Sequence, residues 1–173
     1  MKLALSLLSL LMAISLHAGS VVEVAPKSAT AISPNKSLEA RFSQTSPENW
    51  RENLGRVVIR KRKHVLTEHY FGSRLIARAA WSPDSKFCVF TTVSSGGHSP
   101  WHFDSYVFRL SDLSFHYMDD VIGCVINPDF AFEAPSIAVM TIHDFSTGLD
   151  APGAPKSVKV DLAKEVSKME LDK

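Results

Sequence analysis

Short runs of β-branched and aromatic residues, separated by turn residues, extend along most of this chain. Strands with turns every ~8–12 residues are typical of antiparallel all-β folds, and no long segment between residues 36 and 143 keeps a helical period. We therefore expect an all-β protein. The expected strands are residues 21–24, 38–43, 56–60, 64–71, 75–81, 87–93, 105–110, 113–118, 121–126, 137–142 and 157–162.

A proline-containing turn recurs in this pattern. Ser33-Pro34, Ser82-Pro83 and Asn127-Pro128 follow one another at intervals of 49 and 45 residues. Proline presets φ for a β-turn, and the Asn or Asp that follows it suits the next position. A period in the forties is the length of a four-stranded propeller blade. The chain is therefore expected to form an antiparallel meander of two to three propeller-like sheets.

The central copy of this motif carries a family resemblance. Trp81-Ser82-Pro83-Asp84-Ser85-Lys86-Phe87, followed by Val89-Phe90-Thr91, resembles the blade repeat of TolB-type and WD40-like propellers. In that repeat the Ser-Pro-Asp-Gly-Lys turn joins the first two strands. The first copy has Asn35 in place of Asp, and the third has an insert at residues 130–135 before its strand. The resemblance implies architecture only, because such folds host many functions.

The number of repeats leaves three arrangements open. A closed propeller needs at least four blades, and three periods do not supply them. The sheets could form an open stack, two chains could complete one propeller, or the sheets could collapse into a sandwich or barrel. Exposed blade edges promote association, which favours a homodimer.

The N-terminus has the pattern of a secretory signal peptide, residues 1–20. Lys2 is followed by a leucine-rich apolar run and then by small residues, with cleavage expected after Ala18 or Ser20. The run is short for a membrane anchor, and no cysteine near the cleavage site could accept a lipid. We expect a soluble exported protein, periplasmic or extracellular. Residues 21–35 form an N-terminal strand and loop, 36–162 the β domain, and 163–173 a charged tail with one or two helical turns.

Charge is balanced overall but unevenly distributed. Without residues 1–20 the chain has 18 basic and 18 acidic residues, which argues against nucleic acid as a partner. Residues 51–78 contain eight basic and two acidic residues, whereas residues 104–150 contain eight acidic residues and Arg109. This asymmetry indicates either a binding face or neighbouring sheets of opposite charge. The basic run at residues 60–64 is expected at a solvated hairpin end; lipid headgroups, wall polymers or acidic protein are its alternative partners.

The two cysteines, Cys88 and Cys124, each lie in an apolar strand pattern. An oxidising compartment permits a disulfide between them, and two buried free thiols are the alternative.

The loop at residues 94–104 holds the candidate ligand-binding residues. His98, Trp101, His102 and Asp104 combine imidazoles, an indole and a carboxylate in a glycine-rich segment. Pro100 argues against a helix that would align the two histidines, so no metal site and no cofactor is expected.

Catalytic and calcium-binding motifs are weak in this sequence. No Gly-x-Ser-x-Gly elbow or His-Glu-x-x-His motif is present, and no catalytic residue is assigned. The pair Asp119-Asp120 fits a tight turn better than a calcium loop. We expect a non-enzymatic exported binding or interaction module. One alternative is a small metal-dependent or serine hydrolase that uses the loop with His143 and Asp144. The other is a structural subunit that pairs through open sheet edges.

Overall fold

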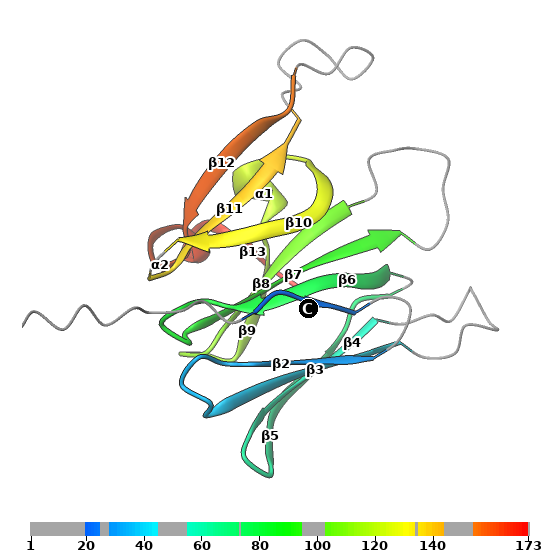
Figure 1. Cartoon of the computed structure of the whole chain (residues 1–173), viewed down its shortest axis with the longest axis vertical. Helices are drawn as coiled ribbons and strands as arrows, with labels where there is room; N and C mark the ends of the chain where they lie inside the picture. Colours follow the sequence, from blue (N-terminus) through cyan, green and yellow to red (C-terminus); the bar gives the residue numbers. More distant parts are fainter. Residues whose placement is uncertain are drawn as a thin grey trace, which may run out of the picture.

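The chain forms three antiparallel β-sheets packed face to face, with one sheet between the other two (Figure 1). The computed structural model describes residues 20–24, 28–44, 55–72, 74–94, 103–133, 135–143 and 154–172. Within these ranges none of the sheets closes into a barrel. The all-β prediction is confirmed. The predicted signal peptide lies outside the described residues except for Ser20, so export stays a prediction.

The sheets have four, six and three strands. The first sheet has the order β2-β3-β4-β5, with bounds Ala29–Ile32, Leu38–Gln44, Gly55–Lys61 and His64–Tyr70. The central sheet has the order β1-β6-β7-β8-β9-β13, with bounds Val22–Glu23, Arg74–Trp81, Phe87–Ser94, Phe103–Arg109, Ser114–Tyr117 and Glu170–Leu171. The third sheet has the order β10-β11-β12, with bounds Val125–Glu133, Ile137–Ile142 and Lys156–Asp161. The helical turns are α1 (Asp119–Ile122), α2 (Leu162–Glu165) and η2 (Val166–Lys168).

The central sheet is buried on both faces. Along β7, Cys88 and Phe90 pack into the core shared with the first sheet, while Val89 packs into the core shared with the third. Trp81 at the end of β6 is fully buried, and its indole nitrogen donates to the Ala31 carbonyl of β2 at 3.0 Å. This hydrogen bond fixes the first sheet against the central one.

The first sheet buries only one of its faces. Leu38, Ala40 and Phe42 of β3 are buried against the central sheet. Side chains alternate along a strand, so Glu39 and Arg41 lie on the opposite face. Among the described residues no other sheet covers that face.

Two of the three predicted turns have the same hydrogen bonds. The Ser33 backbone N–H donates to the Leu38 carbonyl at 3.0 Å, and its hydroxyl accepts from the Leu38 N–H at 3.0 Å. Ser82 makes the same pair of bonds with Phe87, at 2.8 and 3.0 Å. Each turn joins the first two strands of its meander. The expected β-turns at both positions are confirmed.

Each of these two turns contains one residue with a positive φ, and the two turns are in contact. Lys36 has φ 58° and Ser85 has φ 61°, where the family repeat usually has glycine. The Asn35 N–H donates to the Ser85 hydroxyl at 3.2 Å. The 49-residue spacing therefore places equivalent turns side by side. Whether these meanders are propeller blades stays a prediction.

The third predicted turn is wrong. Residues 127–129 lie inside β10, where the pairing with β11 shifts register between Val125 and Phe130. Such an irregularity leaves residues unpaired, and a proline fits there because it has no N–H to donate. The hairpin between β10 and β11 comes later, around Pro135 and Ser136.

Two further expectations are corrected. The strand expected at residues 121–126 begins only at Val125, because Asp119–Ile122 forms the helical turn α1 in place of a tight turn. The segment 25–35, expected as a loop, contains the strand β2. The remaining expected strands are confirmed with small shifts at their ends, as are the helical turns before the C-terminus.

Candidate functional site

Asp104 is the member of the predicted loop site that the structure describes. His98, Trp101 and His102 lie outside the described residues, so their part in a site stays a prediction. Asp104 is 8% exposed and forms an ion pair with Arg74 of β6. It also accepts a hydrogen bond from the Tyr117 hydroxyl at 2.9 Å. Its carboxylate therefore already has partners within the fold.

A second carboxylate, Asp119, completes this buried cluster. The Ser105 backbone N–H and hydroxyl both donate to Asp119, the N–H at 3.0 Å. The Tyr117 hydroxyl lies 3.3 Å from its other oxygen. Burial raises the pKa of Asp119 to about 6, although the bonds from Ser105 act in the opposite direction. Asp119 thus ties α1 to β8, a role that the sequence did not indicate.

The described part of the chain contains no cluster of metal-ligating side chains that would support the metal-dependent alternative. No group of three or more His, Cys, Asp or Glu side chains there could hold an ion. His143 ends the pairing at β11, where its N–H donates to the Cys124 carbonyl at 3.1 Å. Asp144 lies outside the described residues.

Among the residues that the structure describes, no helix is long and hydrophobic enough to span a membrane.

The two cysteines are free thiols in the structure. Cys88 is fully buried in β7, and burial raises the pKa of its thiol. Cys124 is exposed, contrary to the expectation that both would be buried. Of the two alternatives for Cys88 and Cys124, the structure therefore has the free thiols and not the disulfide.

The basic run at residues 60–64 forms a hairpin end, as expected. β4 ends at Lys61, and β5 begins at His64. The turn between them places Arg62 at φ 55°. All four residues after Arg60 are exposed. This hairpin end borders the uncovered face of the first sheet.

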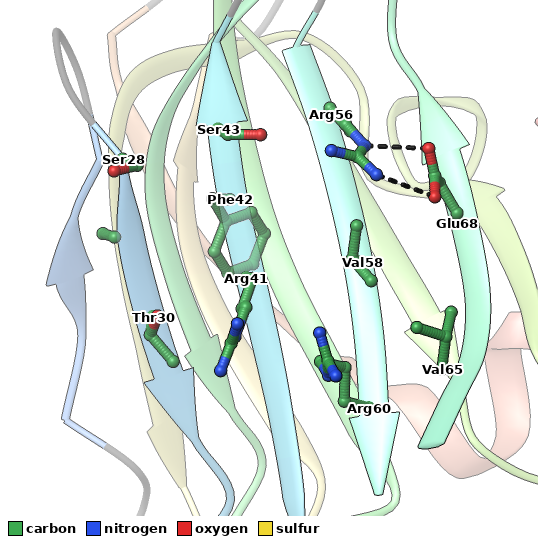
Figure 2. Close-up of a pocket in the computed structure, with 11 residues that line it drawn as sticks. Ser28, Thr30, Arg41, Phe42, Ser43, Arg56, Val58, Arg60, Val65 and Glu68 are labelled. Carbon is green, nitrogen blue, oxygen red and sulfur yellow. Dashed lines mark hydrogen bonds and ion pairs between the residues drawn. The ribbon is translucent and has the colours of Figure 1, made fainter. Parts of the chain in front are cut away.

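That uncovered face forms a cavity of about 430 Å³ (Figure 2). We call it the arginine face, because Arg41, Arg56 and Arg60 line it together with hydroxyl and apolar side chains. The other lining residues are Ser28, Ala29, Thr30, Phe42, Ser43, Val58, Val65 and Glu68. Val58 at its centre is only 8% exposed, although it points away from the core. The long side chains around Val58 therefore make the sheet surface hollow.

The three arginines differ in their partners. Arg56 donates to both oxygens of Glu68, at 2.8 and 2.9 Å, and Figure 2 shows this pair at one end of the cavity. The Arg56 guanidinium and the Tyr70 hydroxyl lower the pKa of Glu68 to about 2. Charges at this end of the cavity are therefore balanced.

The other end of the cavity has an excess of positive charge. Arg41 pairs with Glu39 at 3.0 Å. Arg60 lies directly opposite Glu39 in the pairing of β3 with β4, yet it donates to the Lys63 carbonyl at 3.1 Å. No described carboxylate forms an ion pair with Arg60. Of these two guanidinium groups, only that of Arg41 has a carboxylate partner among the described residues.

Large apolar side chains are exposed on the same sheet. Ile32, Val65 and Tyr70 are each about half exposed, and they share the solvent side of the sheet with Val58 in the strand register. Interfaces are enriched in arginine and tyrosine around an apolar centre. The arginine face combines both features.

The sequence contained a signal for this site that charge counts alone did not reveal. In Arg56-Val57-Val58-Ile59-Arg60 the two arginines are four residues apart, so they share one face of a strand. Arg41 joins them only through the register of β3, which places it opposite Val58.

Comparison with known proteins adds nothing to this assignment. The chain matches no protein family, no curated protein and no solved structure.

Proposed function

We propose that this chain is an exported binding module that recognises an anionic partner through the arginine face. The observation that carries the proposal is the pair Arg41 and Arg60, which line one cavity, while Glu39 pairs with Arg41 alone. Guanidinium groups bind carboxylates and phosphates through paired donors. An acidic group placed between the two arginines would receive hydrogen bonds from both.

The surroundings of the pair support the same partner chemistry. Lys61, Arg62 and Lys63 at the hairpin end add positive charge beside the cavity. Fields of one sign raise the rate at which an oppositely charged partner arrives. Val58 and Val65 supply an apolar floor, so the ligand is expected to carry apolar atoms between its acidic groups.

Binding through a face is favoured over pairing through sheet edges. β12 is an edge strand of the third sheet and carries Lys156, Lys159 and Asp161. Charged residues on an edge strand oppose the addition of another strand. The arginine face has no comparable barrier to a partner of opposite charge.

Calorimetric titration with a hexa-L-glutamate peptide at low salt tests the proposal. We expect binding that weakens as salt is added, because salt screens exposed charges. Hexa-L-glutamine, the neutral counterpart, should not bind. The double variant Arg41→Gln/Arg60→Gln should bind hexaglutamate about tenfold more weakly or worse, since a hydrogen bond to a charged group contributes ~1.5–3 kcal/mol.

The control is Arg109→Gln/Lys159→Gln, which lowers the net charge by as much as the test variant does. Its two residues lie on the central and third sheets, away from the arginine face. Binding by this control should match the parent protein. If both double variants lose affinity to the same extent, overall charge governs binding and the arginine face is not the site. Absence of any hexaglutamate binding by the parent protein also contradicts the proposal.

A further inference from the structure

The stack of three sheets has two outer faces, and among the described residues no sheet covers either of them (Figure 1). One is the arginine face of the first sheet. The other belongs to the third sheet, where Ala138 and Met140 of β11 pack into the core and Val139 between them points away from it. We call this second surface the third-sheet face. The chain therefore ends in a different sheet surface on each side of the stack.

Neighbouring sheets inside the chain touch through equivalent turns. The turns β2–β3, β6–β7 and β10–β11 lie next to one another. The Asn35 N–H of the first donates to the Ser85 hydroxyl of the second at 3.2 Å. The Asp84 N–H of the second donates to the Pro135 carbonyl of the third at 3.3 Å. The same step, taken once more beyond the third sheet, would place the arginine face of another copy on the third-sheet face.

The third-sheet face carries two carboxylates with an apolar side chain between them. Glu133 of β10 and Asp161 of β12 both lie directly opposite Ile137 of β11, so the three residues form one row across the sheet. We call this the acidic row. Adjacent strands are ~4.8 Å apart, which places the two acidic residues about 10 Å from each other. Acidic groups with apolar atoms between them are what the arginine face is expected to recognise.

The cations beside the acidic row are exposed and replaceable. Lys159 pairs with Glu133 at 2.7 Å, and its side chain is 62% exposed. Lys164 pairs with Asp161 at 3.2 Å, and its side chain is 77% exposed. Exposed ion pairs of this kind contribute little to stability. A guanidinium group binds a carboxylate through paired donors, so arginines from another copy can take the place of both lysines.

The arginine face has matching donors and a matching apolar surface. The Nε of Arg60 is buried and has no hydrogen-bond partner among the described residues, although Nη2 of the same group donates to the Lys63 carbonyl. A buried donor without a partner is destabilising, and a carboxylate bound along the edge of the guanidinium would relieve this. Val58 and Val65 line the same cavity, where they can receive an aliphatic side chain.

We propose that the partner of the arginine face is a second copy of this chain, which docks by its third-sheet face. This inference rests on the proposed function and names the partner. The two carboxylates of the acidic row accept hydrogen bonds from Arg41 and Arg60 of the next copy, and Ile137 packs on the apolar floor of the cavity. Because the two surfaces differ, the contact is heterologous and forms either a closed ring or an open filament.

Sedimentation velocity over a range of protein concentrations at low salt tests this proposal. We expect self-association that weakens as salt is added, because salt screens exposed charges. Arg41→Glu/Arg60→Glu should raise the dissociation constant of self-association at least tenfold. Glu133→Lys/Asp161→Lys should do the same. An equimolar mixture of these two variants should associate again, because their reversed charges are complementary.

A third double variant is the matched control. Asp120→Lys/Glu170→Lys reverses two exposed carboxylates on α1 and β13, outside both outer faces. It should associate as the parent protein does. Thermal unfolding followed by circular dichroism should show that all three double variants are folded, so that a loss of association reports on the interface.

Hexa-L-glutamate separates this inference from the proposed function. It should compete with self-association and shift the parent protein towards monomer. If hexaglutamate binds through Arg41 and Arg60 while the parent protein stays monomeric at every concentration, the proposed function stands and the second copy is not the partner. Absence of hexaglutamate binding by dilute monomer overturns the proposed function and this inference with it. Self-association that persists in both charge-reversal variants, or that their mixture does not restore, overturns this inference alone.

Discussion

Arg41 and Arg60 lie diagonally across the pair β3–β4, with Arg41 opposite Val58 and Arg60 two residues further along. Diagonal neighbours in a sheet are ~7–8 Å apart at their Cα atoms, within reach of long side chains. Like charges at this distance oppose each other unless an anion lies between them. Glu39 pairs with Arg41 and leaves Arg60 without a carboxylate partner among the described residues, and a ligand could supply that partner.

Removal of the internal carboxylate should strengthen anion binding. Glu39→Gln leaves Arg41 without its ion pair, so both guanidinium groups become available to a ligand. We expect hexaglutamate to bind more tightly than to the parent protein in a calorimetric titration at low salt. A change in the opposite direction would indicate that Glu39 positions Arg41 for binding.

The turn at Ser82 should contribute measurably to stability. Ser82 is fully buried, accepts a hydrogen bond from the Phe87 N–H at 3.0 Å and donates to Asp84 at 2.6 Å. Ser82→Ala leaves the Phe87 N–H without a partner, which costs ~1–3 kcal/mol. Urea denaturation should show this loss in the free energy of unfolding. Ser111→Ala, in an exposed turn, should show no loss; equal stability of the two variants would contradict the role given to Ser82.

The part of the fold that could be predicted is the part set by local patterns. Alternating apolar residues specified most strands, and Ser-Pro-Asn or Ser-Pro-Asp specified two turns because each turn is stabilised by its own residues. Residues 127–129 have similar composition and one local bond, from the Asp129 N–H to the Asn127 side chain at 2.9 Å. They form an unpaired stretch inside β10 and not a turn between strands, because Val125 and Phe130 on either side of them pair with β11. Long-range pairing is not visible in a local motif. The arginine face was missed for the same reason.

Asp119 should make stability depend on pH. Its pKa is about 6 in the folded protein and 3.8 as the unperturbed value. Between these values the folded state holds a proton that the unfolded state has lost, so stability falls as pH rises from about 4 to about 6 and then levels off. The loss is on the order of 3 kcal/mol, because the shift is about two pKa units and one unit corresponds to ~1.4 kcal/mol.

Urea denaturation at several pH values checks this expectation. Asp119→Asn cannot ionise, so its free energy of unfolding should lose this pH dependence. The neighbouring Asp120 is exposed, and Asp120→Asn should behave as the parent protein does. If Asp119→Asn and the parent keep the same pH profile, Asp119 does not titrate in this range.

The two thiols should react very differently. Cys124 is exposed and Cys88 is fully buried. Thiol reactivity requires access and ionisation, and burial raises the pKa of Cys88. Iodoacetamide should modify Cys124 in the native protein, whereas Cys88 should react only after denaturation. Peptide mass analysis measures both sites, and a disulfide-linked peptide would contradict the free thiols.

The most direct measurement follows the arginine side chains themselves. Nuclear magnetic resonance of the Nε–Hε groups, recorded during titration with hexa-L-glutamate, reports on each guanidinium separately. We expect the Arg41 and Arg60 signals to shift with one common affinity, while Arg109, paired with Asp112, stays unchanged. A shift confined to Arg62 of the hairpin, or shifts spread equally over all arginines, would contradict binding at the arginine face.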